Sequence, residues 1–207
     1  MLKTEQKDWL EYRDGSALSA AVYDDGPEFE ETETTSTAYW GTLAAVTNTR
    51  AKMVAGWGDK TSNAEVSWEG YWTDGYGGWL RIAVADKVAG AASPATASMS
   101  FHIECVRGPT YHMGDINGKA KVNSTIAFFT DNGKGDADCK KVKGSQETWL
   151  IFEKLPNSPQ VKISGVNTSD YHGMRAYFGG TYTRIGDLPE EERKTMLDGK
   201  FDFGQGR

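Results

Sequence analysis

The cysteines and histidines of this chain are few and lie apart, so they form no recognised catalytic or metal-binding motif. The chain contains two cysteines and three histidines. Cys105 and Cys139 cannot by themselves supply the four ligands of a structural zinc site, and neither belongs to a C-x-x-C redox motif. If the protein is exported, a disulfide between them would tie one edge of the β-structure; two unpaired thiols are the alternative interpretation.

The three histidines each favour a structural interpretation over a chemical one. His102 alternates with apolar residues, as does Glu104, and we expect it to face solvent. His112 is predicted to lie in a loop with Gly and Pro and could join Asp115 around a metal, although a loop residue without a ligand is the favoured interpretation. His172 stands beside a glycine where a strand should begin, and we expect it to bond a backbone carbonyl.

Other signatures of catalysis are missing from the sequence. It contains no HExxH, GxSxG, P-loop or dinucleotide fingerprint. Residues 131–138 resemble a calcium loop, but they lack the ligand order and closing glutamate of an EF-hand, and Lys134 stands in the middle. We therefore predict a protein that is not an enzyme and has no metal or cofactor.

Composition and charge exclude two further classes. The 207 residues include 29 acidic and 23 basic side chains, a net charge of −6, so the dense basic face that nucleic acid requires is not expected. No apolar run approaches the roughly 20 residues of a membrane-spanning helix. The first residues are too polar for a signal peptide, so the protein is either cytoplasmic or has lost a leader.

Acidic residues concentrate in one run, residues 24–33, which has no basic neighbour. Such a run is typical of a solvated loop, and a docking strip for a strongly basic partner is the alternative. The glutamates of that strip would be Glu28, Glu30, Glu31 and Glu33.

Two helices are predicted on either side of this run. Residues 3–23 and 36–57 place apolar side chains at three- and four-residue steps. Thr35 or Ser36 can cap the second helix. Arg50 lies on the apolar face, so it needs a carboxylate partner or must extend to solvent. A helical hairpin of this size is too small to be stable alone and must pack on another element.

From Trp68 the apolar period changes from 3.6 to 2, which indicates β-strands. The side chains predicted to face the core are Leu80, Ile82, Val84, Met99, Phe101, Ile103, Cys105, Ile126, Phe128, Trp149, Ile151, Val161, Ile163, Met174, Ala176 and Phe178. The turn signals are Gly77-Gly78, Asn117-Gly118, Asn132-Gly133 and Pro156-Asn157. About seven or eight evenly spaced strands favour an antiparallel barrel or sandwich, followed by a short helix after Pro189.

The predicted fold is therefore α+β. We expect a helical hairpin over residues 1–60, an antiparallel β-barrel or sandwich over residues 61–186, and a C-terminal helix and tail over residues 187–207. Four aromatic residues could stack on sugars or form a protein-binding hot spot, or they could fill the helix–barrel interface and the barrel mouth. These are Trp72, Tyr76, Trp79 and Tyr111.

Residues 3–57 resemble the second half of the LprI-type lysozyme-inhibitor-like helical module of bacterial envelope proteins. The matching string Q-x-x-W-x-x-Y-R-D consists of Gln6, Trp9, Tyr12, Arg13 and Asp14, and Thr47 and Arg50 match the later T-x-x-R pattern. The chain lacks the two cysteines of the family, and the family's preceding helix is not among these residues. The β-region is similar to the small barrels that sometimes follow the module, with Gly173, Arg175, Phe178, Gly180 and Tyr182 near its closing end.

The resemblance implies an exported, periplasmic or envelope-associated binding protein that inhibits a lysozyme-like cell-wall hydrolase. A basic lysozyme would be attracted by the acidic run, and the loop that contains Tyr111 and His112 could enter an active-site cleft. The alternatives are an envelope protein that binds another protein, a toxin or a polysaccharide, and a small-ligand carrier that uses the barrel interior. The partner-binding candidates are Glu28, Glu30, Glu31, Glu33, Tyr111, His112, Tyr171, His172 and Arg175.

Overall fold

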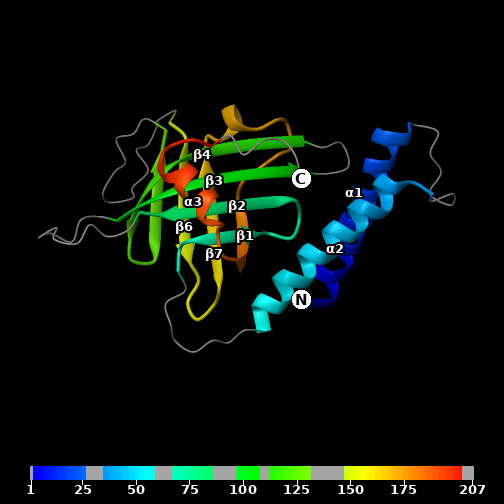
Figure 1. Cartoon of the computed structure of the whole chain (residues 1–207), viewed down its shortest axis with the longest axis horizontal. Coiled ribbons are helices and arrows are strands. Elements are labelled where there is room, and N and C mark those ends of the chain that lie inside the picture. The colour runs from blue at the N-terminus through cyan, green and yellow to red at the C-terminus, as the bar shows by residue number, and fades with distance from the viewer. Residues whose placement is uncertain are drawn as a thin grey trace, which may run out of the picture.

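Two helices lie beside a closed β-barrel in the computed structural model of this chain (Figure 1). The structure describes residues 2–26, 35–58, 67–85, 97–107, 112–131 and 147–201. A third, short helix lies on the outside of the barrel. The predicted α+β arrangement of hairpin, antiparallel barrel and C-terminal helix is thereby confirmed.

The N-terminal hairpin consists of α1 (Leu2–Asp25) and α2 (Thr37–Gly58). Ser36 caps α2, because its Oγ accepts a hydrogen bond from the backbone N–H of Tyr39 at 3.1 Å. The two helices pack through small residues, Ala17 and Ala21, against Tyr39. Among the described residues, neither these helices nor the shorter one has the length and apolar character needed to cross a bilayer.

The apolar face of the hairpin carries one buried charge, and it is paired as expected. Arg50 is buried, and its Nη2 lies 2.9 Å from Oε1 of Glu5. The Trp9 ring lies 5.6 Å from the same guanidinium. The ion pair therefore joins α1 to α2, and of the two alternatives predicted for Arg50 the structure shows the carboxylate partner.

Eight strands form the barrel, and each pairs antiparallel with the next in the sequence. Their bounds are β1 Gly70–Thr73, β2 Gly78–Val84, β3 Ala97–Arg107, β4 His112–Asn123, β5 Ile126–Thr130, β6 Trp149–Lys154, β7 Gln160–Val166 and β8 Gly180–Gly186. β8 pairs back to β1, so the barrel has no open sheet edge.

The barrel interior is filled by side chains. Phe101 packs against Phe129 and Phe152 with ring centroids 4.9 and 5.0 Å apart. The core residues with no exposed surface include Trp72, Leu80, Ile82, Met99, Phe101, Ile103, Leu150, Phe152, Val161 and Tyr182. A water-filled lumen would give these side chains accessible surface. The barrel is therefore packed like an ordinary hydrophobic core.

In β5 and β6 the alternation was predicted with the wrong phase. Phe128 and Trp149 were predicted to face the core, but the core contains their neighbours Phe129 and Leu150. Phe128 and Trp149 instead meet each other, with ring centroids 4.7 Å apart. Both alternating sets in these strands are apolar, so a period of two does not decide which set faces the core.

Two further predictions of local structure were wrong. Asn117-Gly118 was expected in a turn, but it lies within β4, where a Cβ on Gly118 would come 2.5 Å from Cε2 of Phe129. The glycine is needed there for space and not for a turn. Residues 174–178 were expected in a strand, yet they follow the 3₁₀ helix η2 (Ser169–Tyr171) as irregular chain, and Met174 is 80% exposed.

The short helix α3 (Glu190–Leu197) lies over the outside of β2 and β3 (Figure 1). Its buried Met196 packs with Leu188 and with Ala83 of β2. Phe201, just after the helix, packs against the same cluster. The C-terminal segment therefore covers part of the outer surface of the sheet.

Candidate functional site

The β1–β2 turn is held by the carboxylate of Asp74 and by the hydroxyl of Thr73, which accepts from the N–H of Gly75 and donates to the carbonyl of Gly78. Oδ1 of Asp74 accepts hydrogen bonds from the backbone N–H groups of Tyr76 and Gly78, each at 2.8 Å. Gly75 and Gly77 adopt positive φ of 78° and 84°, which side chains other than glycine rarely adopt. The turn is thus fixed locally, and its second carboxylate oxygen points elsewhere.

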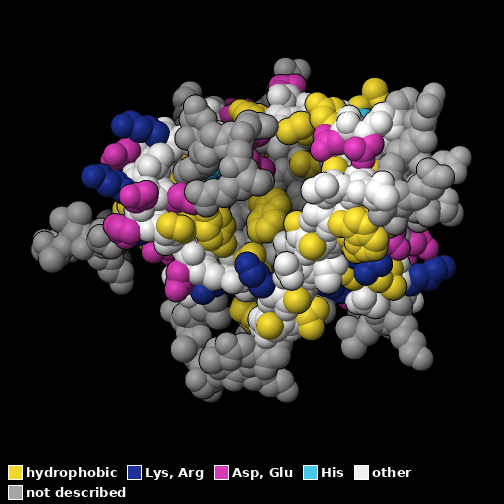
Figure 2. Space-filling model, turned by 45° about the vertical axis from the view of Figure 1, so that its right-hand side comes forward, with side chains coloured by type: hydrophobic (Ala, Val, Ile, Leu, Met, Phe, Trp, Pro, Cys, Tyr) yellow, Lys and Arg dark blue, Asp and Glu magenta, His cyan; other side chains and the backbone are white. Residues whose placement is uncertain are grey.

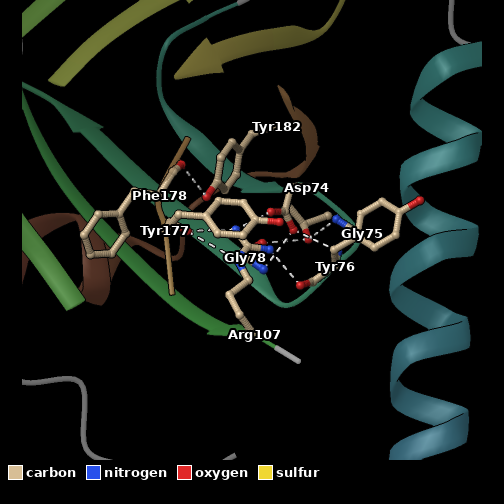
Figure 3. A network of polar contacts seen from close by, with 9 residues as sticks. Asp74, Gly75, Tyr76, Gly78, Arg107, Tyr177, Phe178 and Tyr182 are labelled. Atoms are coloured by element: carbon tan, nitrogen blue, oxygen red, sulfur yellow. Dashed lines mark hydrogen bonds and ion pairs between the residues drawn. The ribbon is translucent and has the colours of Figure 1, made fainter. Parts of the chain in front are cut away.

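That second oxygen binds a buried arginine at the end of β3. Nη2 of Arg107 lies 2.6 Å from Oδ2 of Asp74, and Nη1 donates to the carbonyl of Tyr76 at 2.7 Å. Nε and Nη2 donate to the carbonyl of Tyr177 at 3.3 and 3.2 Å. Figure 3 shows the Tyr177 ring lying over the guanidinium, whose carbon is 4.5 Å from the ring centroid. Arg107 therefore ties the turn to the segment before β8.

The ionisable groups around Arg107 are held in fixed protonation states. Burial lowers the pKa of Arg107, but the charge and hydrogen bond of Asp74 raise it by more, so the pKa is higher than usual. Burial, together with the charge of Asp74, raises the pKa of Tyr182, whose hydroxyl donates to the carbonyl of Phe178 at 3.1 Å. Burial also raises the pKa of Cys105. The arginine stays charged, and the phenol and thiol stay neutral.

The helical hairpin contacts this end of the barrel. The Tyr76 hydroxyl donates to the backbone carbonyl of Glu5 at 3.3 Å, and its ring lies 5.5 Å from the ring of Tyr12. A Cβ on Gly75 would lie 2.8 Å from the sulfur of Met53. Of the four aromatic residues that the sequence singled out, Tyr76 fills this interface, Trp72 is in the barrel core, Trp79 is partly exposed and Tyr111 lies outside the described residues.

A cleft of about 350 Å³ lies between the hairpin and the barrel. Its lining combines aromatic rings, carboxylates, an amide and hydroxyls, and it consists of Glu5, Met53, Asp74, Tyr76, Gln160, Tyr177, Gly179, Gly180, Thr181 and Thr183. Figure 2 looks at the molecule with the hairpin side turned forward; this face is hollowed near its middle, with hydrophobic side chains in the hollow.

The charges of the cleft are balanced within the protein. Glu5 is paired with Arg50 at 2.9 Å and Asp74 with Arg107 at 2.6 Å. Tyr177 is 54% exposed although its ring lies on the guanidinium. The cleft thus offers a fixed aromatic surface and polar atoms without a net charge from these two ion pairs.

The residues predicted to bind a partner lie elsewhere or outside the described part of the chain. Glu28, Glu30, Glu31, Glu33, Tyr111 and Cys139 lie outside it. His112 begins β4, Tyr171 ends η2, and Arg175 follows with a positive φ of 73°. His172 forms an isolated bridge with Gly114, so these segments meet at the start of β4. The cleft is lined by other residues.

His172 contacts a backbone carbonyl as expected, although no strand begins there, and its role in partner binding stays a prediction. Its Nδ1 lies 3.0 Å from the carbonyl oxygen of Gly173, and Nε2 lies 3.0 Å from Oγ1 of Thr168. Cys105 is a buried free thiol in this structure. Because Cys139 lies outside the described residues, the pairing of the two cysteines stays a prediction.

His102 was expected at the surface, and this prediction was wrong. It is only 3% exposed, although it points away from the barrel core, because Phe201 of the C-terminal segment lies over it with ring centroids 6.3 Å apart. Its Nε2 lies 2.7 Å from Oδ2 of Asp115, and its Nδ1 lies 3.3 Å from Nη1 of Arg81.

Sequence reasoning missed Asp74, Arg107 and Tyr177 as a unit. One signal could have identified Arg107. It continues the inward-facing series of β3 two residues after Cys105, so it is a charged residue at a core position. A buried charge needs a partner, and Asp74 is that partner.

No protein-family model, no curated protein and no solved structure matches this chain. The structure itself shows an N-terminal helix pair followed by an eight-stranded antiparallel barrel. The Arg13–Asp14 pair of the resemblance is an ion pair on the hairpin, with Nη2 and Oδ1 2.6 Å apart.

Proposed function

We propose that this chain is a non-catalytic binding protein of the bacterial envelope, and that it binds a neutral saccharide chain in the cleft between hairpin and barrel. The observation that carries the proposal is the rigidly held, half-exposed ring of Tyr177 beside charge-balanced polar groups. A pyranose ring has an apolar C–H face that packs on an aromatic ring and hydroxyls that bond polar side chains at its rim.

The aromatic surface is preorganised. Arg107 holds Tyr177 twice, through hydrogen bonds to its carbonyl and through contact with its ring. The exposed part of the ring therefore needs little ordering when a ligand binds. Lower ordering cost is a direct gain in affinity.

The polar groups favour an uncharged ligand with many hydroxyls. Thr181, Thr183 and Gln160 line the cleft, and Nε2 of Gln160 donates to Oγ1 of Thr183 at 3.2 Å, which fixes both side chains. The carboxylate of Asp74 can accept hydroxyl hydrogen bonds, but its charge is already balanced by Arg107. A cationic ligand would gain less here than at an unpaired carboxylate.

Two observations support a binding function that involves no catalysis and a ligand site that lies outside the barrel. The raised pKa values of Cys105 and Tyr182 keep the thiol and phenol neutral, the opposite of an activated nucleophile. The fully buried core side chains speak against a carrier that holds its ligand inside the barrel. The envelope location rests on the resemblance of residues 3–57.

The test is isothermal titration with the neutral oligosaccharide chitotetraose. Tyr177→Ala is expected to weaken binding about 10-fold, since an aromatic stacking contact contributes roughly 0.5–1.5 kcal/mol beyond burial. Tyr23→Ala is the matched control, because Tyr23 is 85% exposed near the other end of α1 from Glu5. Saccharides that do not bind at millimolar concentration, or equal binding by both variants, would refute the proposal.

Inhibition of a lysozyme-like hydrolase is the second candidate, and the helix pair with its Arg13–Asp14 ion pair favours it. The assay is lysis of suspended cell walls by lysozymes of several classes, with and without stoichiometric protein. Inhibition that weakens with salt and with neutralisation of Glu28, Glu30, Glu31 and Glu33 would support it. Full lysis at micromolar protein for every class would reject it.

A further inference from the structure

The outer face of the barrel carries a second cluster of polar side chains that the saccharide cleft does not use. We propose that His102, Glu104 and Asp115 bind one divalent transition-metal ion of the Zn²⁺ type. Each offers one ligand atom, and these atoms all lie within 4.8 Å of one another. This inference is independent of the proposed function, because no residue of the cluster lines the cleft.

The sheet register places the three ligands together. His102 and Glu104 are alternate residues of β3 and so share one face, and Asp115 of β4 stands directly opposite Glu104. Directly opposed like charges destabilise a strand pair. A cation between the two carboxylates would relieve this repulsion, and the two rigid strands would keep its ligands in place.

The donor set and its access fit a metal such as zinc. An imidazole nitrogen together with carboxylate oxygens is a donor set that Zn²⁺ accepts, whereas Mg²⁺ prefers oxygen alone. His102 is nearly completely buried and fixed, and the side chain of Asp115 is 57% exposed. An ion can therefore enter from solvent along Asp115 and meet an imidazole that is already oriented.

Arg81 now supplies the positive charge next to this cluster. It pairs with Glu104, its Nη1 lies 3.3 Å from Nδ1 of His102, and its Nε lies 3.5 Å from Oε2 of Glu192 on α3. The Tyr71 hydroxyl also donates to Glu192. A metal ion at Glu104 would displace the guanidinium toward Glu192, so Arg81 would keep a carboxylate partner.

The formal charges agree with this exchange. Glu104, Asp115 and Glu192 carry three negative charges and Arg81 one positive charge, so a divalent ion brings these four side chains close to neutrality. Nε2 of His102, which lies 2.7 Å from Oδ2 of Asp115, is the imidazole atom that would bind the ion.

Bound metal would join β3 to β4 and strengthen the contact of Arg81 with α3. Ligand binding to the native state alone raises the unfolding temperature. At a Zn²⁺ concentration 100-fold above the dissociation constant, we expect an increase of about 5–10 °C for a domain of this size.

The experiment is titration of the tag-free protein with ZnCl₂ in a chelator-free buffer, followed by calorimetry and thermal unfolding, with Co²⁺ absorption as a spectroscopic readout of nitrogen ligation. One saturable site is expected. Asp115→Asn keeps the side-chain size at an exposed position and should weaken Zn²⁺ binding at least 10-fold. Asp170→Asn, an exposed control on η2, should bind like the parent protein.

A second control replaces a histidine outside the proposed metal site. His172→Gln should retain the site, because His172 lies outside the cluster. The proposal is overturned if Zn²⁺ at 100-fold molar excess neither binds saturably nor shifts the unfolding temperature. It is equally overturned if Asp115→Asn binds Zn²⁺ as tightly as the parent protein, or if the site disappears in His172→Gln alone.

Discussion

Replacement of Arg107 by methionine is expected to destabilise the protein by about 3–4 kcal/mol. Loss of one member of a buried ion pair leaves the other charge without compensation, which typically costs about 3–5 kcal/mol. Asp74 keeps two backbone N–H donors at 2.8 Å, which stabilise its charge in part. The carbonyls of Tyr76 and Tyr177 lose their guanidinium donors, which adds to the cost. The first effect lowers the cost and the second raises it; because both N–H donors to the Asp74 charge are kept, we expect the net loss in the lower half of that range.

The assay is equilibrium unfolding in urea, followed by tryptophan fluorescence. A loss of this size should lower the unfolding temperature by roughly 10 °C in a domain of about 200 residues. Arg175→Met is the matched control, because Arg175 is exposed and because arginine and methionine are equally strained at the positive φ of this position. If the methionine variant does not fold, Arg107→Lys, which keeps the charge without the planar fork of donors, gives an intermediate loss.

A double-mutant cycle tests the reasoning itself. Asp74→Asn keeps an oxygen that can accept the turn hydrogen bonds but removes the charge. If the ion pair is the cause, Asp74→Asn combined with Arg107→Met should be less destabilised than the sum of the two single variants by at least about 1 kcal/mol. Additive losses, or a loss below 1 kcal/mol in Arg107→Met, would refute the assignment of Arg107 as the group that ties the turn to the segment before β8.

Two other predictions concern a glycine and the effect of alkaline pH. Gly77→Ala should lower the free energy of unfolding in urea by roughly 2–4 kcal/mol, because the φ of Gly77 is positive and a Cβ would collide with the carbonyl of Val106. Gly15→Ala is the control, since Gly15 lies in open space on α1 and alanine should stabilise the helix by about 0.5–1 kcal/mol. An unchanged stability of Gly77→Ala would contradict this prediction. Cys105 and Tyr182 have raised pKa values in the native state, so the unfolded chain loses their protons first and stability should fall as pH rises above their ordinary values of 9.0 and 10.0. Tyr182→Phe should remove up to about 1.4 kcal/mol per pH unit of that fall above pH 10, measured as urea midpoints between pH 8 and 11, and an unchanged slope counts against it.

Local signals in the sequence predicted the helices and most of the strands, but they missed β4 and placed the last strand at residues 174–178 instead of at β8. A three- and four-residue apolar period and a cap at Thr35 or Ser36 predicted α2, and one charge on its apolar face indicated that Arg50 needs either a carboxylate partner or solvent; the structure shows Glu5 as that partner. A period of two predicted most strands and hence an antiparallel barrel or sandwich. These signals act over a few residues, so they can be recognised without knowing what packs against them.

The same signals failed where two interpretations are locally equivalent. Apolar residues at consecutive positions in β5 and β6 made either phase acceptable, and only the tertiary structure shows that Phe129, not Phe128, joins the core cluster. Gly118 resembled a turn residue, but the ring of Phe129 from a neighbouring strand explains it. His102 followed the outward alternation, yet the segment after α3 covers it.

By itself the sequence determined the order and type of the elements: a helix pair, an antiparallel β-region and a short final helix. Only the tertiary structure decided that the sheet closes through β1 and β8 and that Arg107 joins Tyr76 and Tyr177, which lie 31 and 70 residues away. Helix periods and caps depend on neighbours within one or two turns. A buried charge network depends on which distant groups the fold places within hydrogen-bond distance, and no local pattern contains that information.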